Sequence, residues 1–191
     1  MNSTKRNRGE ENEFTNKKES KDSNRKMRAI VQAEEKDKEE ILRLYKTQLG
    51  REFCPWDETY PGEKEIEFDL SRDALFVMKD EKGKIIASIS IDEDEAVEKL
   101  ECWTPELQPG KELSRLAVDP DYQNHGLARE MLQYGMQVVY SQGYKSVHFL
   151  VNRHNKKALR SYAALNFQTV GECELYDQPF LCYEKALIQA L

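Results

Sequence analysis

A short polar segment, QNHGLA at Gln123–Ala128, stands where an apolar stretch ends and a helical pattern begins. The start of a helix leaves its first backbone N–H groups without partners, and the helix dipole makes that end electropositive. Phosphate groups bind well there, and Gly126 permits both a positive φ and a close approach of the ligand. The N–H groups that could converge on a pyrophosphate are those of Asn124, His125, Gly126, Leu127 and Ala128. The segment therefore predicts a site for a phosphorylated anion.

Two better-known phosphate-binding motifs do not occur at this position. A dinucleotide-binding turn needs Gly-x-Gly-x-x-Gly directly after the strand, and a P-loop needs Gly-Lys followed by Ser or Thr. Neither pattern is present. The pattern Gln-x-x-Gly-x-Ala also fits many ordinary strand-to-helix turns, so a turn without a ligand stays open as an alternative.

The segment lies within a regular order of predicted elements. Apolar runs bounded by turn residues predict seven strands, at 27–32, 74–78, 84–91, 112–118, 146–151, 167–175 and 180–187. Helical spacing and end signals predict four helices, at 37–50, 63–72, 126–142 and 155–166. The strand, helix and strand around the polar segment form a parallel crossover between hairpins, which predicts a mixed α/β sheet.

Three local expectations accompany this order. A capping box of Asp37 and Glu40 is expected to begin the first helix. Asn166 is suited to a left-handed backbone where the fourth helix ends. The acidic segment 92–110, which contains Pro105 and Pro109, is expected to be the least ordered part of the folded region.

The polar segment resembles motif A of the GNAT superfamily of N-acetyltransferases, which reads Gln/Arg-x-x-Gly-x-Gly/Ala. In that family the motif follows a strand ending in an apolar residue, Ala and Val, here Leu116, Ala117 and Val118. A second segment, NKKALRSYAALNF at 155–167, resembles the family's N-x-x-A-x-x-x-Y-x-x-x-G-F, with Asn166 in the place of Gly. The order of elements over 27–187 also fits that fold.

The resemblance implies acetyl-CoA as the acyl donor, without a metal. Its pyrophosphate would lie on Gln123–Ala128, and its pantetheine arm would pair with the backbone of Leu116, Ala117 and Val118 like an added strand. Asn155 would hydrogen-bond the arm near the thioester, although a simple N-cap role would also explain this residue. In the family the donor strand also splays from the next one, which is a feature that the sequence does not display.

The implied reaction is direct attack of an amine on the thioester within a ternary complex. Tyr162 matches the family's general acid, which protonates the leaving thiolate, and a core tyrosine is the alternative. Glu112 occupies the place where several members carry a general base. A solvated carboxylate at Glu112, with an ordered water as the base, stays open. The backbone N–H of Val118 or a neighbour could polarise the acetyl carbonyl.

The acceptor is expected at the loop after the first helix and at segment 92–110. Trp56, Asp57 and Tyr60 combine aromatic rings with a carboxylate, which suits a cation through charge and cation–π contact. We therefore expect a primary amine, either a small cationic molecule or a basic protein amine. Loops that only keep the protein soluble are the alternative.

Charge is unevenly spread along the 191 residues, whose net charge is −6. Residues 1–26 carry eight Lys and Arg against five Asp and Glu, and subtracting that +3 from −6 leaves −9 for the remainder. An acidic domain argues against nucleic acid as a partner. Residues 1–26 have almost no apolar side chains and are expected to form a disordered leader to a domain spanning 27–191, with Met27 as an alternative start.

The remaining composition indicates a cytoplasmic protein. No signal peptide and no apolar run long enough to span a bilayer is found in the sequence, so no membrane association is expected. The four cysteines and three histidines form no zinc pattern, and idle thiols in a reducing compartment are expected. A homodimer stays open. An acyl-CoA sensor or interaction module without turnover, and an acetylating toxin acting on charged transfer RNA, also stay open.

Overall fold

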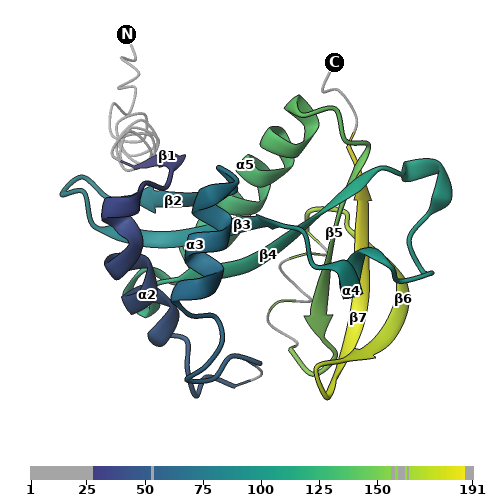
Figure 1. The fold of residues 1–191 in the computed structure, drawn as a ribbon, viewed down its shortest axis with the longest axis horizontal. Coiled ribbons are helices and arrows are strands. Elements are labelled where there is room, and N and C mark those ends of the chain that lie inside the picture. Colours follow the sequence, from purple (N-terminus) through teal and green to yellow (C-terminus); the bar gives the residue numbers. More distant parts are fainter. Residues whose placement is uncertain (1–27, 53, 156–157, 159–161, 163, 188–191) are drawn as a thin grey trace, which may run out of the picture.

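The computed structural model describes residues 28–187, except 53, 156–157, 159–161 and 163. The predicted leader at 1–26 and the alternative start at Met27 lie outside the described residues. Within them the chain forms one seven-stranded sheet in the order β1-β2-β3-β4-β5-β7-β6 (Figure 1). The strands are β1 (Ala29–Gln32), β2 (Leu75–Lys79), β3 (Ile85–Asp92), β4 (Gly110–Val118), β5 (Ser146–Asn152), β6 (Gln168–Leu175) and β7 (Gln178–Ala186).

Helices cover both faces of this sheet (Figure 1). The described α-helices are α2 (Lys38–Lys46), α3 (Glu63–Ser71), α4 (Glu95–Glu98) and α5 (Leu127–Ser141). Ile41 of α2 and Ile66 of α3 are buried against Val77 on one face. Met131 of α5 is buried against Ile89 on the other face. The predicted mixed α/β sheet is confirmed. The predicted helix at 155–166 falls largely outside the described residues, although Ala158 and Tyr162 are helical.

The pairing of β4 and β5 is the feature that creates space in the molecule. β4 pairs with β5 in parallel at three positions, and the last of these is Glu112 opposite His148. β4 continues from there along β3, while β5 continues along β7 as far as Asn152. The two strands therefore diverge beyond Glu112, which is the splay that the family resemblance implied and the sequence did not display.

A β-bulge lies on β4 just past this point. Arg115 has a positive φ of 46°, and the register with β3 shifts between Ser88 and Ser90. The extra residue changes the face of the sheet to which the later side chains of β4 point, because a bulge places two residues of one strand opposite one residue of the other. Leu113 accordingly packs in the α5 core, whereas Ala117 packs in the core under α2 and α3.

Two of the local expectations are wrong. Asp37 occupies the N-cap position of α2, but its side chain forms no capping box with Glu40, because its carboxylate accepts hydrogen bonds from the Glu34 backbone N–H (3.1 Å) and from Lys79 Nζ (2.7 Å). Segment 92–110 folds against the sheet and contains α4. It buries Trp103, whose Nε1 donates a hydrogen bond to the Val97 carbonyl at 2.8 Å. The third holds, because Asn166 has the expected left-handed backbone, with φ 58°.

Candidate active site

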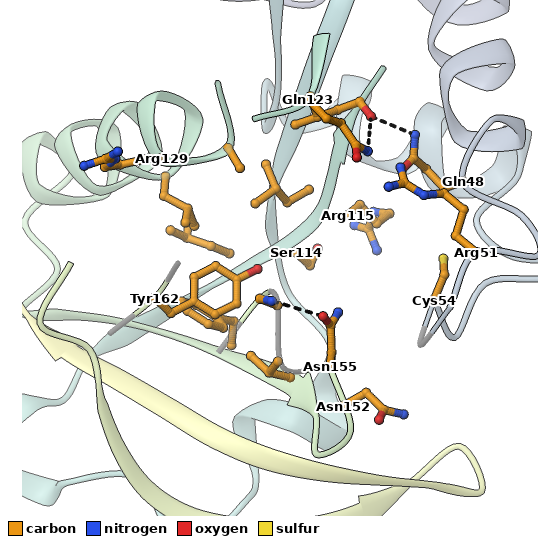
Figure 2. Close-up of a pocket in the computed structure, with 18 of the residues that line it drawn as sticks. Gln48, Arg51, Cys54, Ser114, Arg115, Gln123, Arg129, Asn152, Asn155 and Tyr162 are labelled. Atoms are coloured by element: carbon orange, nitrogen blue, oxygen red, sulfur yellow. Dashed lines mark hydrogen bonds between the residues drawn. The ribbon is translucent and has the colours of Figure 1, made fainter. Parts of the chain in front are cut away.

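A cavity of about 830 Å³ occupies the splay between β4 and β5 and extends to the start of α5 and the loop after α2. In it Tyr162 and Asn155 face Gln48 and Gln123 across the opening (Figure 2). The predicted site residues that line it are Trp56, Leu116, Val118, Gln123, Asn124, Gly126, Leu127, Ala128, Asn155 and Tyr162. The predicted residues outside its lining are Asp57, Tyr60, Glu112, Ala117 and His125.

The turn before α5 presents backbone donors to this cavity. Asn124 and Gly126 both have left-handed backbones, with φ 64° and 82°. The first helical hydrogen bond runs from the Glu130 N–H to the Gly126 carbonyl at 3.1 Å. Among the described residues, the N–H groups of 124–129 have no acceptor, so the turn forms a concave set of donors that suits an anion. The side chain of His125 is exposed, with Nδ1 3.3 Å from the Tyr122 carbonyl oxygen.

The free edge of β4 forms one wall of the cavity. The Val118 carbonyl accepts hydrogen bonds from Gln48 Nε2 (3.1 Å) and Gln123 Nε2 (3.5 Å), as the dashed lines in Figure 2 mark. Gln48 in turn accepts from Arg51 Nη1 at 2.7 Å. The Ala117 side chain is buried in the core, so only its backbone is available to a ligand. Sequence reasoning missed Gln48 and Arg51, because the segment after α2 carries no motif that marks them.

Asn155 and Tyr162 form the opposite wall. Asn155 Oδ1 accepts a hydrogen bond from the Ala158 N–H at 3.0 Å, so the N-cap role is present beside any role toward a ligand. The Tyr162 ring packs against Phe149 with centroids 4.7 Å apart, and its hydroxyl points into the cavity on the side of Ser114 (Figure 2). Burial raises the pKa of Tyr162 to about 12, which keeps the phenol protonated at neutral pH.

Glu112 lies at the point where the strands diverge. Its side chain is buried, at 6% exposure, and its Oε2 has no hydrogen-bond partner among the described residues. Burial, together with the charges of Asp92 and Asp94, raises the pKa of Glu112 well above its usual value. It does not line the cavity itself, but Ser114, two residues further along β4, does. The solvated alternative for Glu112 does not fit this burial.

A buried ion network that the sequence did not reveal supports the bulge. The Arg115 guanidinium contacts Asp69 at 2.8 Å and Asp92 at 2.6 Å, and it also lines the cavity. The Ser114 hydroxyl donates to Asp92 at 2.9 Å. Although burial opposes the effect, the hydrogen bond and charge of Arg115 lower the pKa of Asp92. No sequence pattern marks this set, because a bulge and three distant elements bring it together.

The predicted acceptor residues do not gather in one place. Trp56 lines the cavity and packs edge-on against Tyr45, with centroids 5.3 Å apart. Asp57 is exposed and accepts hydrogen bonds from the backbone N–H groups of Thr59 (2.7 Å) and Tyr60 (3.0 Å), so it stabilises its own turn. The Tyr60 hydroxyl accepts a hydrogen bond from Arg115 Nη1 at 3.3 Å. Of the three, only Trp56 contributes to the cavity.

Two features are absent from the described residues. No cluster of three or more His, Cys, Asp or Glu side chains in this part of the chain has a geometry that could hold a metal ion. None of the described helices combines the length and the hydrophobicity that crossing a membrane requires.

Known structures share this fold. The ribosomal-protein-S18-alanine N-acetyltransferase from Escherichia coli is 19% identical, with a TM-score of 0.65 over 86% of this chain and 96% of that one. A putative acetyltransferase from Salmonella typhimurium, solved with its cofactor acetyl-CoA, is 15% identical, with a TM-score of 0.67 over 86% and 96%. A GCN5-related N-acetyltransferase from Kribbella flavida is 15% identical, with a TM-score of 0.68 over 85% and 99%.

The sequence itself gives the family. Among curated proteins no sequence is significantly similar to the chain. The model of the acetyltransferase (GNAT) family matches residues 38–167, which include the splayed strands, the turn before α5 and Tyr162. The chain therefore belongs to the GNAT family of acetyltransferases.

Proposed function

We propose that this protein transfers the acetyl group of acetyl-CoA to a primary amine by direct attack within a ternary complex. The observation that carries the proposal is the cavity between β4 and β5, which joins a turn of N–H donors without acceptors among the described residues to a partly buried phenol. A long ligand with an anionic end and a reactive end suits that shape. Acetyl-CoA has both, and the protonated phenol and a buried carboxylate supply an acid and a base.

The residues present fit the donor. The pyrophosphate would be held by the backbone N–H groups of Asn124 to Ala128, where the start of α5 favours negative charge. The pantetheine arm would lie along the backbone of Leu116–Val118. An amide of the arm would then compete with Gln48 and Gln123 for the Val118 carbonyl. Asn155 lies beside the path of the arm, on the opposite wall.

The chemistry assigns one role to each of two side chains. The amine nitrogen forms a bond to the acetyl carbon, and the bond from that carbon to sulfur breaks. Because Glu112 does not line the cavity, the proton that the amine loses reaches it through one water, and a raised pKa makes its carboxylate a stronger base than an ordinary Glu. Tyr162, protonated at neutral pH, donates a proton to the departing sulfur.

The acceptor is a small cationic amine or a basic protein amine. The support is the acidic surroundings of Glu112, where Asp92 and Asp94 add negative charge and Arg115 is already paired with Asp69 and Asp92. Trp56 supplies an aromatic surface on the cavity wall. Trp56 and segment 92–110, which contains Asp92 and Asp94, belong to the set that the sequence suggested, whereas Asp57 stabilises its own turn.

An amine panel with a thiol-release readout tests the proposal. It compares 1,4-diaminobutane with butylamine, and a peptide in which basic residues flank a lysine with one in which glutamates flank the same lysine. We expect the second positive charge to raise kcat/KM and the acidic peptide to be the poorest acceptor. A neutral or acidic amine as the best acceptor would contradict the charge argument. Tight binding of acetyl-CoA without turnover of any amine would favour an acyl-CoA sensor instead.

A further inference from the structure

The turn between β6 and β7 holds a tyrosine in an unfavourable backbone conformation. Leu175 ends β6 and Gln178 begins β7, so Tyr176 and Asp177 alone connect the two strands. Both have left-handed backbones, with φ 53° and 56°. Such a turn favours Asn and Gly, and a tyrosine there is strained. The Tyr176 residue is 62% exposed, so burial in the core does not compensate for the strain. Strain of this kind points to a function for the side chain.

The Tyr176 hydroxyl connects this turn to segment 92–110. It donates a hydrogen bond to Asp94 Oδ2. The other oxygen of the same carboxylate, Oδ1, accepts a hydrogen bond from the Ala96 N–H at 2.9 Å and caps α4. The Asp94 carboxylate is therefore held in one position by a contact on each oxygen.

Asp94 differs from its acidic neighbours in having no cation beside it. Asp92 is paired with Arg115 at 2.6 Å. Glu93 is paired with Lys111 at 2.7 Å. No Lys or Arg in the described part of the chain forms an ion pair with Asp94, which is half-buried. Its negative charge is therefore available to a ligand that carries a positive charge.

The contact between Tyr176 and Asp94 lies close to Glu112. Asp94 follows two residues after Asp92, the register partner of Glu112 in β4. Burial, then the charges of Asp92 and Asp94, raises the pKa of Glu112. Burial and the hydrogen bond to Asp94 raise the pKa of Tyr176, and the charges of Glu112 and Tyr60 add to this effect. Glu112 is 6% exposed, and its Oε2 has no hydrogen-bond partner among the described residues. Two tyrosines and two carboxylates therefore lie near one another on the acceptor side.

We propose that Asp94 and Tyr176 bind a second ammonium group of the acceptor, so that the enzyme prefers a small diamine to a monoamine. The inference rests on the proposed function, because it assumes an amine acceptor with Glu112 as its base. The ammonium would donate a hydrogen bond to the Asp94 carboxylate and contact the exposed ring of Tyr176 by a cation–π interaction. One carboxylate without a cation matches one additional charge, which a linear diamine carries close to its reacting nitrogen.

The kinetic test compares kcat/KM for 1,4-diaminobutane and butylamine in wild type, Asp94→Asn and Glu95→Gln. Asn caps a helix as well as Asp does, so α4 is retained. Glu95→Gln is the matched control, because it makes the same change of charge at the next residue, whose side chain is 81% exposed and paired with Lys99. We expect Asp94→Asn to lower the ratio of the diamine value to the butylamine value about tenfold, through KM for the diamine. The ratio is the readout, because Asp94 also acts on Glu112. A ratio that stays as in wild type would overturn the proposal.

Tyr176→Asn separates a role in binding from a role in the turn. Asn suits a positive φ better than Tyr does, so the melting temperature should not fall. The preference for the diamine should nevertheless decrease, because Asn has no ring and cannot make the contact that the longer side chain makes. An unchanged preference in Tyr176→Asn would show that Tyr176 serves the turn alone and would contradict the proposal.

A binding measurement needs no turnover and separates this proposal from the proposed function. 1,4-Diaminobutane is titrated by calorimetry into the full chain in the presence of CoA. We expect wild type and Glu95→Gln to bind it alike, and Asp94→Asn to bind it about tenfold more weakly. Equal affinity in wild type and Asp94→Asn would refute the role of Asp94, even if the protein acetylates diamines. Binding that depends on Asp94, in a protein that acetylates no amine, would support this site and contradict the proposed function. Turnover of a lysine peptide without any binding of the diamine would refute the preference for a small diamine.

Discussion

Replacing Tyr162 by Phe removes a single hydroxyl from the inside of the cavity. The ring would keep its contacts with Phe149 at 4.7 Å and Phe167 at 6.4 Å, so stability should change by less than about 1 kcal/mol. Loss of a general acid should lower kcat by about 10²- to 10⁴-fold. At about 1.4 kcal/mol for each factor of ten, that is about 3 to 5 kcal/mol of transition-state stabilisation.

The assay is release of the free thiol of CoA at saturating donor, with thermal unfolding measured on the same samples. Tyr183→Phe is the control, since it removes a hydroxyl from the same aromatic cluster at a residue that does not line the cavity. We expect Tyr162→Phe to lose turnover with an unchanged melting temperature, and Tyr183→Phe to retain turnover. Equal kcat values for the two variants would refute the assignment of Tyr162 as the acid.

Two further predictions concern buried charge. The folded pKa of Glu112 is raised by burial, so the stability that its protonated form contributes is present at low pH and is lost as pH rises through that pKa. Glu112→Gln should therefore raise the melting temperature relative to wild type more at pH 8 than at pH 5. A difference in melting temperature between Glu112→Gln and wild type that is the same at pH 5 and pH 8 would contradict this prediction. Arg115→Met removes the cation that pairs with Asp69, whose side chain is 0% exposed, and should cost about 3 to 5 kcal/mol in urea unfolding. A cost below about 1 kcal/mol would show that Asp69 does not need this partner.

The sequence was sufficient for the sheet and for the donor side of the site. Both depend on local signals, because strand and helix periods and the residues of the turn are read within a few positions. Gly126 and Asn166 illustrate this, since each has the left-handed backbone that its residue type favours. Asn155 and Tyr162 lie on one wall of the cavity for the same reason, as their spacing is that of a single helix.

The acceptor side depends on contacts between distant segments, so the sequence indicated Trp56 and segment 92–110 but not the arrangement that joins them to the cavity. The bulge at Arg115 has no sequence signature, yet it determines which face each later residue of β4 occupies. The position of Glu112 beside His148 requires the parallel register of β4 and β5, and the stacking of Trp103 on His148 requires segment 92–110 to fold over these strands. Asp57 was assigned to the acceptor from its residue type, but its hydrogen bonds serve its own turn.

The central claim is that acetyl-CoA binds in the splay with its pyrophosphate on the turn before α5. Calorimetric titration of acetyl-CoA into wild type, Gly126→Glu and Gly143→Glu tests it most directly. The two glycines are matched, because both have positive φ (82° and 88°), both face open space, and they lie at opposite ends of α5. We predict that Gly126→Glu weakens binding by at least about tenfold, or about 1.4 kcal/mol, while Gly143→Glu binds as wild type does. Equal affinity in both variants, or no binding by the folded wild type, would contradict the account.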